Sequence, residues 1–332
     1  MLITKAILHI LDFNSDVSVF SQKELDISNI TLVEYLEKHL EHLQKDANQK
    51  PGEFMAGSTF LAQMDQYLNA EKSFIEFSDY VGNRLYEQIA HSDKLEPIDL
   101  LVVDFTDEDI RYIALMLLTS KAAYTHQVLN TDGVVENQII RHYAILPNTA
   151  QKIDSYALIN CATKAIGFSD KKCSVEGAET YVLADKLLQC TSSVSSKEAV
   201  KIVNKIVTDV VEQHGENPAL MISKAKKFLR DNAEVASAFS PKEMGAELFS
   251  GSEQMEREFE KQVNDKQLPK NIKLEKNFAI RTGKNHKIKT DTGIEISFPV
   301  EYFENPNFIE FVNNPNGTIS IEVKNIGKIT NK

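Results

Sequence analysis

The sequence predicts an α+β fold with three parts. An N-terminal antiparallel sheet with packed helices occupies residues 1–178, a helical segment follows over 179–264, and a small β-rich basic region fills 265–332. Two apolar runs flank an acidic turn near residue 107, amphipathic runs dominate the middle, and short β-like runs separated by Gly and Asn occupy the end. With 332 residues, 42% of them hydrophobic, the chain can bury a sizeable core in two or three domains.

The centre of the predicted sheet is a hairpin. Residues 100–105 and 110–118 are rich in Val, Ile, Leu and Tyr, which suits strands buried on at least one face. Between them lie Thr106, Asp107, Glu108 and Asp109, whose Asp side chains can bond nearby backbone amides in a tight turn. The second run could instead begin a helix, because a short apolar run does not distinguish the two.

Before this hairpin, we expect a strand pair over 2–13 and 17–21, joined by a turn at 14–16. Thr31 and Glu34 form a predicted capping box that opens a helix with a leucine stripe. The sequence Lys-Pro-Gly at 50–52 breaks that pattern, and helices are predicted over about 54–69 and 71–90.

After the hairpin, strands are predicted at 121–130, 137–146 and 156–161, with a turn at Asp132-Gly133. Residues 179–264 look almost continuously helical, with a capping box at Ser195 and Glu198, a stop at Gly215 and a start at Pro218. These helices could form a domain beginning near 175–195 or pack on the sheet. The last region should contain strands at 278–281, 287–289, 294–298 and 318–323, with turns at 283–285, 291–293 and 316–317.

Charge is unevenly distributed. The net charge of −11 argues against a protein that coats DNA over its whole surface. Residues 270–289, however, contain seven cations and one anion, Glu275, so this stretch carries +6 and the remaining residues carry −17. The sequence therefore predicts an acidic molecule with one basic stretch.

Cysteine use and hydropathy indicate a cytoplasmic protein. Cys161, Cys173 and Cys190 form no CxxC pair and cannot all pair with one another, which fits a reducing compartment and predicts buried structural thiols. No apolar run approaches the roughly 20 residues of a membrane helix. The apolar N-terminus is interrupted by Asp12 and lacks a small-residue cleavage site, so it predicts a first strand and no signal peptide.

The ordered segments resemble a known family. The similar pieces are AILHIL at 6–11, FSDYVGNRLYEQI at 77–89, DLLVVDF with RYIALMLL in the hairpin, CSVEGAE at 173–179, GIEISFPVEYF at 293–303 and NGTISIEV at 316–323. Together they resemble the bacterial nucleoid-associated proteins of the NdpA/YejK type over nearly the whole chain. The resemblance implies a cytoplasmic protein found with the bacterial chromosome, and it supplies no catalytic residues.

The basic stretch is the main candidate for binding DNA. Flexible cations can meet backbone phosphates, and an aromatic such as Phe278 can stack on an exposed base. On a strand, Lys287 and Lys289 would project from one face, where lysines also serve as guards of a solvated edge strand. The candidate residues in this stretch are Lys270, Lys273, Lys276, Arg281, Lys284, Lys287 and Lys289.

A second cationic cluster lies on a predicted helix and comprises Lys224, Lys226, Lys227 and Arg230. Lys226 and Arg230 are four residues apart and share a helix face, so with Lys227 they could contact phosphates. The alternative, which we favour, is the solvated side of a helix whose other face is apolar. The apolar residues of that face are Leu220, Ala225, Phe228 and Leu229.

Other chemistries have weaker signals. The acidic residues Asp104, Asp107, Glu108 and Asp109 could hold a divalent cation but read better as a solvated hairpin tip. Glu322-x-Lys324 with Asp291 is similar to part of a metal-dependent nuclease site.

A second possible metal site is His39-x-x-His42, which we interpret as a surface pair. Phosphate-binding and nucleophile motifs are absent from the sequence, and no cofactor is predicted.

The resulting hypothesis is a non-enzymatic nucleoid-associated protein that contacts double-stranded DNA weakly and without sequence preference. A homodimer would double the basic patches and raise avidity. One alternative is an adaptor whose acidic body binds a DNA-maintenance protein of topoisomerase type without touching DNA. The other is the metal-dependent nuclease. No membrane partner is expected.

Overall fold

The computed structural model describes residues 1–13, 17–92, 97–119, 121–175, 177–216, 218–303, 305–314 and 318–330. The chain forms two compact units, Met1–Ser193 with a hydrophobic core on each face of its sheet and Val194–Lys332 with a core of its own. Among the described residues, no helix has the length and apolar character needed to cross a bilayer. The α+β class predicted from the sequence is confirmed.

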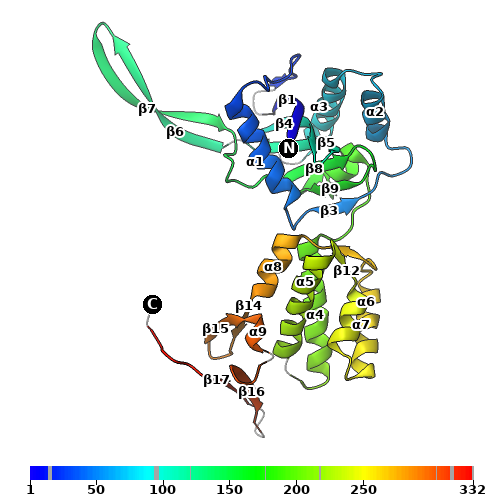
Figure 1. Ribbon diagram of the computed structural model, residues 1–332. Coiled ribbons are helices and arrows are strands. Elements are labelled where there is room, and N and C mark those ends of the chain that lie inside the picture. The colour runs from blue at the N-terminus through cyan, green and yellow to red at the C-terminus, as the bar shows by residue number, and fades with distance from the viewer. Residues whose placement is uncertain are drawn as a thin grey trace. The chain divides into compact units, whose positions relative to one another are not determined.

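The first unit is built on a seven-stranded, fully antiparallel sheet (Figure 1). The strand order is β2-β1-β4-β5-β8-β9-β3, so the predicted hairpin supplies two inner strands. The strands are β1 (Leu2–Asp12), β2 (Val17–Val19), β3 (Lys50–Gly52), β4 (Ile98–Asp107), β5 (Ile110–Thr119), β8 (Ser155–Asn160) and β9 (Ile166–Ser169).

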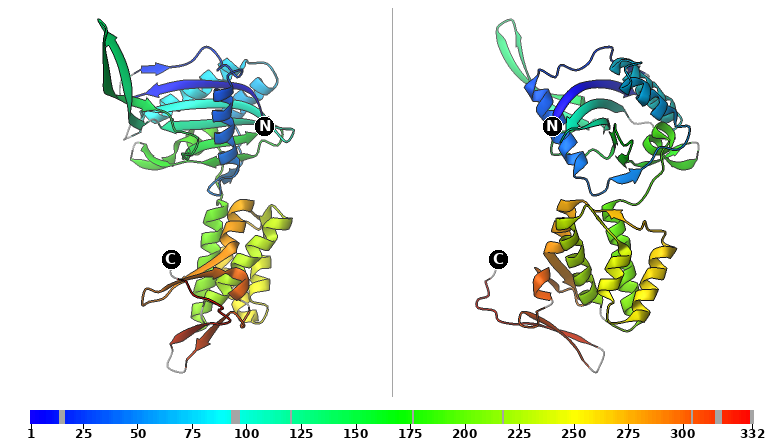
Figure 2. Two further views of the ribbon diagram at one scale, coloured as in Figure 1. Left: turned by 60° about the vertical axis from the view of Figure 1, so that its left-hand side comes forward. Right: turned by 45° about the vertical axis from the view of Figure 1, so that its right-hand side comes forward.

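Helices cover both faces of this sheet. The left view of Figure 2 shows α1 (Ile30–Gln44) crossing one face. On the other face lie α2 (Thr59–Leu68), α3 (Phe74–Ala90) and the π-helix η1 (Val182–Leu188). Alternate strand residues feed two cores: Leu101 and Met116 pack with α1, whereas Val102 and Leu115 pack with α2, α3 and η1. Burial of both faces explains why these strands read as continuous apolar runs.

The turn between β4 and β5 contains two residues, Glu108 and Asp109, both in the left-handed region with φ of 47° and 63°. Two-residue turns of this handedness match the twist of a hairpin. The alternative in which the second run begins a helix is therefore wrong. Asp104 lies away from the turn, fully buried on β4, where it accepts bonds from Tyr67 and from Arg111 of β5.

Helix starts differ in part from the prediction. Helix α1 begins at Ile30, because the side chain of Asn29 accepts a bond from the Leu32 amide (3.3 Å). The predicted capping box at Thr31 and Glu34 is therefore wrong. A capping box does open α3, where Ser73 and Glu76 satisfy each other's backbone amides.

Both edges of the large sheet are short or covered. Strand β2 has three residues. Strand β3 contains Pro51, and the backbone of 189–193 runs beside it, with the Ser193 amide donating to the Pro51 carbonyl (3.0 Å). Gly52 permits this close approach, because a Cβ there would lie 2.6 Å from the Thr191 carbonyl oxygen.

Strands β6 (Lys121–Thr131) and β7 (Val134–Ile145) form a separate two-stranded hairpin, here called the arm. Figure 1 shows the arm extending away from the seven-stranded sheet. Its turn is the predicted Asp132-Gly133, with φ of 52° and 81°. A second small hairpin pairs β10 (Lys172–Val175) with β11 (Ala178–Tyr181).

The second unit begins with helices around one core. Ser195 caps α4, Gly215 follows its end with φ of 74°, and Pro218 starts α5, as predicted. The nearly continuous helix expected over 179–264 is instead interrupted by short strands. The elements are α4 (Ser196–Gln213), α5 (Pro218–Val235), β12 (Ala238–Phe239), α6 (Pro241–Leu248), α7 (Glu253–Asp265), β13 (Ile272–Lys273) and α8 (Lys276–Lys284).

The chain then forms two small hairpins joined by α9 (Val300–Phe303). The first pairs β14 (Asn285–Lys289) with β15 (Glu295–Pro299), and the second pairs β16 (Ile309–Asn313) with β17 (Ile319–Val323). These agree with the strands predicted at 287–289, 294–298 and 318–323. The turns predicted at 14–16 and 316–317 lie outside the described residues.

The three thiols differ in environment. Cys190 is buried, as predicted, and burial raises its pKa to about 12. Cys161 and Cys173 are only half-buried, so the prediction of three buried thiols is wrong for these two.

Candidate nucleic-acid interface

The centre of the basic stretch is helix α8, where the sequence predicted a strand at 278–281 and a turn at 283–285. Glu275 caps the helix by accepting bonds from the amides of Asn277 and Phe278. Its start is tied to α4, because Ser196 Oγ donates to the Lys273 carbonyl (2.7 Å) and accepts from the Glu275 amide (3.2 Å). The strand prediction was wrong because these hydrogen bonds join residues far apart in the sequence, which the local sequence pattern does not reveal.

Packing against α5 decides which side of α8 is buried. Ala279 and Gly283 are buried on the packed side. At Gly283 a Cβ would lie 2.5 Å from Arg230 Cβ and 2.8 Å from the Lys226 carbonyl oxygen, both on α5. Glycine at position 283 therefore allows α8 and α5 to pack closely. The turn predicted at 283–285 is wrong.

The side of α8 next to the packed side carries the cations. Successive helical residues are about 100° apart, so Lys276, Lys284 and Arg281 fall within an arc of about 140°. All three are exposed. Arg281 Nε donates to the Asn277 carbonyl of its own helix (3.3 Å), which directs its stem along the helix surface.

Strand β14 continues directly from α8 and extends the exposed charge. Lys287 and Lys289 are exposed, while His286 is buried and Ile288 is half-buried between them. This is the alternation predicted from the sequence. Lys289 forms an ion pair with its cross-strand neighbour Glu295 (3.3 Å). Among the described residues, we find no ion pair to Lys276, Arg281, Lys284 or Lys287.

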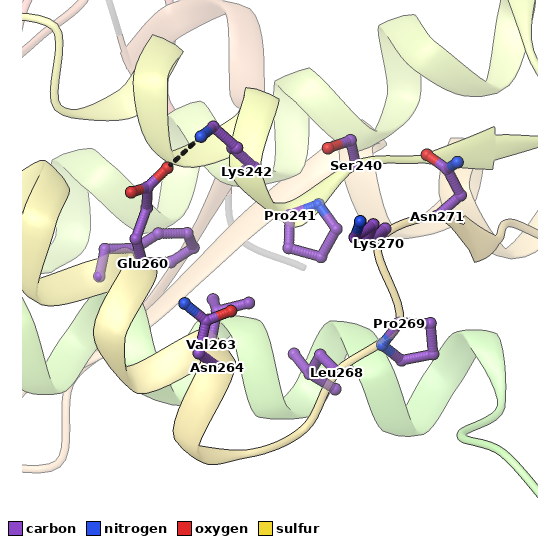
Figure 3. A pocket seen from close by; sticks show the side chains of 11 residues that line it. Ser240, Pro241, Lys242, Glu260, Val263, Asn264, Leu268, Pro269, Lys270 and Asn271 are labelled. Carbon is purple, nitrogen blue, oxygen red and sulfur yellow. Dashed lines mark ion pairs between the residues drawn. The ribbon is translucent and has the colours of Figure 1, made fainter.

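Lys270 and Lys273 precede α8 and occupy different surroundings. Lys273 lies on the short strand β13, opposite Ala238. Lys270 lines a hollow of about 420 Å³ between α6 and α7 (Figure 3). In Figure 3, Lys242 and Glu260 form an ion pair (3.1 Å) at one side and Lys270 lies at the other. The hollow thus has mixed charge, which favours neither phosphate nor cation.

The second cluster on α5 is engaged within the protein. Arg230, whose side chain is 19% exposed, pairs with Asp231 (3.1 Å) and with Glu301 of α9 (3.0 Å). Lys226 and Lys227 are half-buried, and Lys226 Nζ lies 3.3 Å from His286 Nδ1. Ala225, Phe228 and Leu229 are buried, as expected for the apolar face. The α5 cations thus contribute more to packing than to exposed charge.

Burial lowers the pKa values of both groups in the contact between Lys226 and His286. Burial, and secondarily the charge of Lys226, lowers the pKa of His286 to about 4. Burial also lowers the pKa of Lys226. His286 is therefore neutral at pH 7, which lets it tolerate a nearby ammonium group.

One further row of cations was not singled out from the sequence. Lys197, Lys201 and Lys205 are exposed on α4 at intervals of four residues, a spacing that would have revealed them. Helix α4 also carries three acidic residues, so its net charge is zero. Residues 276–289, in contrast, contain no acidic residue. Charge therefore distinguishes the α8–β14 surface, defined as Lys276, Arg281, Lys284, Lys287 and Lys289.

Comparison with models of known protein families shows a match over nearly the whole chain. Residues 7–330 match the model of the NA37 family, described as nucleoid-associated protein YejK. The chain belongs to the NA37 family. The match confirms the resemblance seen in the ordered segments and covers both units of this NA37 protein. A search of curated proteins found no match.

The family description names no enzymatic activity. In this NA37 chain, Lys324 pairs with Glu310 and lies 3.6 Å from Glu322, while Asp291 occupies the turn between β14 and β15. Across the described residues there is no group of three or more His, Cys, Asp or Glu side chains able to hold a metal ion.

Two other sequence interpretations need correction. Asp104 is buried against Arg111, and Asp107 lies 3.5 Å from the N-terminal amino group, so the acidic residues of the hairpin do not form a uniformly solvated tip. His39 is buried whereas His42 is exposed, so the prediction of a surface pair is wrong for His39.

Proposed function

We propose that this protein associates with the bacterial nucleoid by binding double-stranded DNA directly, weakly and without sequence preference. The α8–β14 surface makes the contact, and the protein acts by binding rather than by catalysis. Family membership supports a role at the nucleoid. The observation that carries direct binding is five exposed cations in a stretch of fourteen residues without one acidic side chain.

The physical basis is release of counterions from the DNA backbone. Each cation that meets a phosphate releases condensed ions, so log K falls with log salt by about 0.9 per contact. A handful of contacts gives non-specific Kd values on the order of 10⁻⁴ to 10⁻⁶ M at physiological salt. The large negative charge elsewhere repels DNA and confines contact to this surface.

Lys270, Lys273, Lys226, Lys227 and Arg230 have secondary places in this proposal. Lys270 stands across a hollow from a Lys242–Glu260 ion pair. Arg230 is already paired with two carboxylates. We expect these five to tune affinity less than the α8–β14 surface does.

The test is a salt titration of binding to a fluorescent DNA duplex by anisotropy. A variant with Lys276, Arg281, Lys284 and Lys287 changed to Ala should bind at least tenfold more weakly at low salt. Its salt slope should flatten by about 0.9 for each lost phosphate contact. The matched variant changes Lys197, Lys201 and Lys205 on α4 to Ala and should leave both quantities nearly unchanged.

Equal losses in the two variants would show that the contact is diffuse rather than local. Unchanged affinity and slope in the α8–β14 variant would refute the assigned surface. If the unaltered protein fails to bind DNA even at low salt, direct contact is excluded, and the adaptor alternative gains support.

A further inference from the structure

The arm exposes an apolar face that its own unit does not cover. Cross-strand pairing places Tyr124 opposite Arg141, Val128 opposite Asn137, Val135 opposite Asn130 and Ile139 opposite His126. These pairs alternate along the two strands, so all eight side chains share one face. The four apolar members are between 60% and 82% exposed. They are called the arm stripe and comprise Tyr124, Val128, Val135 and Ile139.

A two-stranded hairpin such as the arm has little stability of its own. Two-stranded hairpins are marginally stable in water unless a third strand or another layer packs on them. In both strands of the arm, most of the described side chains are exposed. Exposed β-branched and aromatic residues aligned on one face are typical of a surface that packs on a partner.

Charge along the arm indicates which partner fits. Near the turn it carries Asp132 and Glu136, and near its base it carries Lys121 and Arg141, so its formal charge is zero. Arg141 lies on the face of the stripe and Asp132 lies in the turn, whereas Glu136, opposite Leu129, lies on the other face. Two arms stacked stripe to stripe in opposite directions would set Asp132 at the tip of each arm near Arg141 at the base of the other. A two-fold axis produces this arrangement, because it makes one surface complementary to itself.

We propose that the arm is a dimerisation element that binds the arm of a second copy of this chain. The two stripes pack face to face with the arms antiparallel. A neutral surface of this kind is not attracted to DNA, so dimerisation leaves the α8–β14 surface to the nucleic acid. The inference goes beyond the proposed function and does not depend on it.

The size of the contact sets the expected affinity. An eleven-residue strand is about 36 Å long, and two strands are about 10 Å wide. Two such faces in contact would bury on the order of 700 Å², below the range of standard stable interfaces. We therefore expect a dimer that dissociates reversibly, with a Kd in the micromolar range (about 10⁻⁶ to 10⁻⁵ M).

The test is sedimentation equilibrium of the full chain without DNA, from about 0.01 to 100 times the expected Kd. The unaltered protein should pass from monomer to dimer. Val128→Thr with Ile139→Thr keeps the β-branched shape, removes apolar surface from the stripe and should weaken the dimer at least tenfold. The matched control, Val134→Thr, makes the same change on the opposite face and should have little effect.

A charge exchange tests the antiparallel direction. Arg141→Glu should weaken the dimer by placing like charges at base and tip, and adding Asp132→Lys should restore it. Persistence of a monomer at the highest concentration would overturn the proposal. A dimer unaffected by the stripe variant, or one equally weakened by Val134→Thr, would also overturn it.

Discussion

The buried carboxylate of Asp104 gives the sharpest prediction for the first unit. Its oxygens accept bonds from Arg111 Nε (3.0 Å), Arg111 Nη2 (2.6 Å) and Tyr67 Oη (2.5 Å), and its side chain is fully buried. The guanidinium also lies over the Tyr67 ring, 5.4 Å from its centroid. Burial, and secondarily the bond to Asp104, raises the pKa of Tyr67, so its hydroxyl remains a donor.

Arg111→Ala would leave Asp104 buried with one remaining bond. Hydrogen bonds to charged groups contribute about 1.5 to 3 kcal/mol each, and breaking a buried pair typically costs about 3 to 5 kcal/mol. The Arg111 side chain is 43% exposed, so water can enter its place and offset part of the loss. We therefore expect a loss of about 3 kcal/mol. Tyr67→Phe removes the bond to Asp104 and a longer one from Arg111 Nη2 (3.2 Å), and it should cost about 2 kcal/mol.

Native-state hydrogen exchange measures this loss in the full chain. Amides of β4 and β5 that exchange through opening of the unit should exchange roughly a hundredfold faster in Arg111→Ala. Peptides from α6 and α7 in the other unit provide the internal control. Adding Asp104→Asn should recover part of the protection, because the unpaired charge is gone. Acceleration below about fivefold would refute the reasoning.

Two further predictions concern the second unit. Gly283→Ala should cost about 2 kcal/mol by forcing α8 from α5, measured as faster exchange of α8 amides; Gly251→Ala, with open space around its Cα, should not. Because the folded pKa of His286, about 4, lies below the value of 6.5 in an unfolded chain, its contribution to stability falls as pH drops between these values. The loss reaches about 2 kcal/mol at pH 5, and His286→Leu should show a shallower pH dependence in urea unfolding. A slope unchanged by that substitution would contradict the assigned pKa.

The sequence predicted the sheet better than the helix that carries the candidate site. Long apolar runs report burial directly, which is why the hairpin at 98–119 and the strand at 155–160 were found. Helix α8 was missed because Phe278 and Ile280 favour strands and Gly283 suggests a turn. What makes that segment helical is close contact with α5, more than forty residues earlier in the chain.

In the candidate site, too, the sequence predicted local features and missed those that depend on distant residues. Alternation in β14 correctly predicted that Lys287 and Lys289 share an exposed side, because a strand's period is local. Nothing local in α5 indicates that Arg230 pairs with Glu301, 71 residues away. Such ion pairs determine which cations are held within the protein and which remain exposed to solvent. They are visible only in the tertiary structure.

The covered edges of the large sheet limit how this protein can assemble. An open edge would accept strands from other molecules one after another, giving filaments without a defined end. Here one edge is a three-residue strand, and the other contains Pro51 and is paired with the chain segment at 189–193. Strand addition is therefore blocked at the β3 edge, and the three-residue β2 offers little backbone for pairing at the other edge.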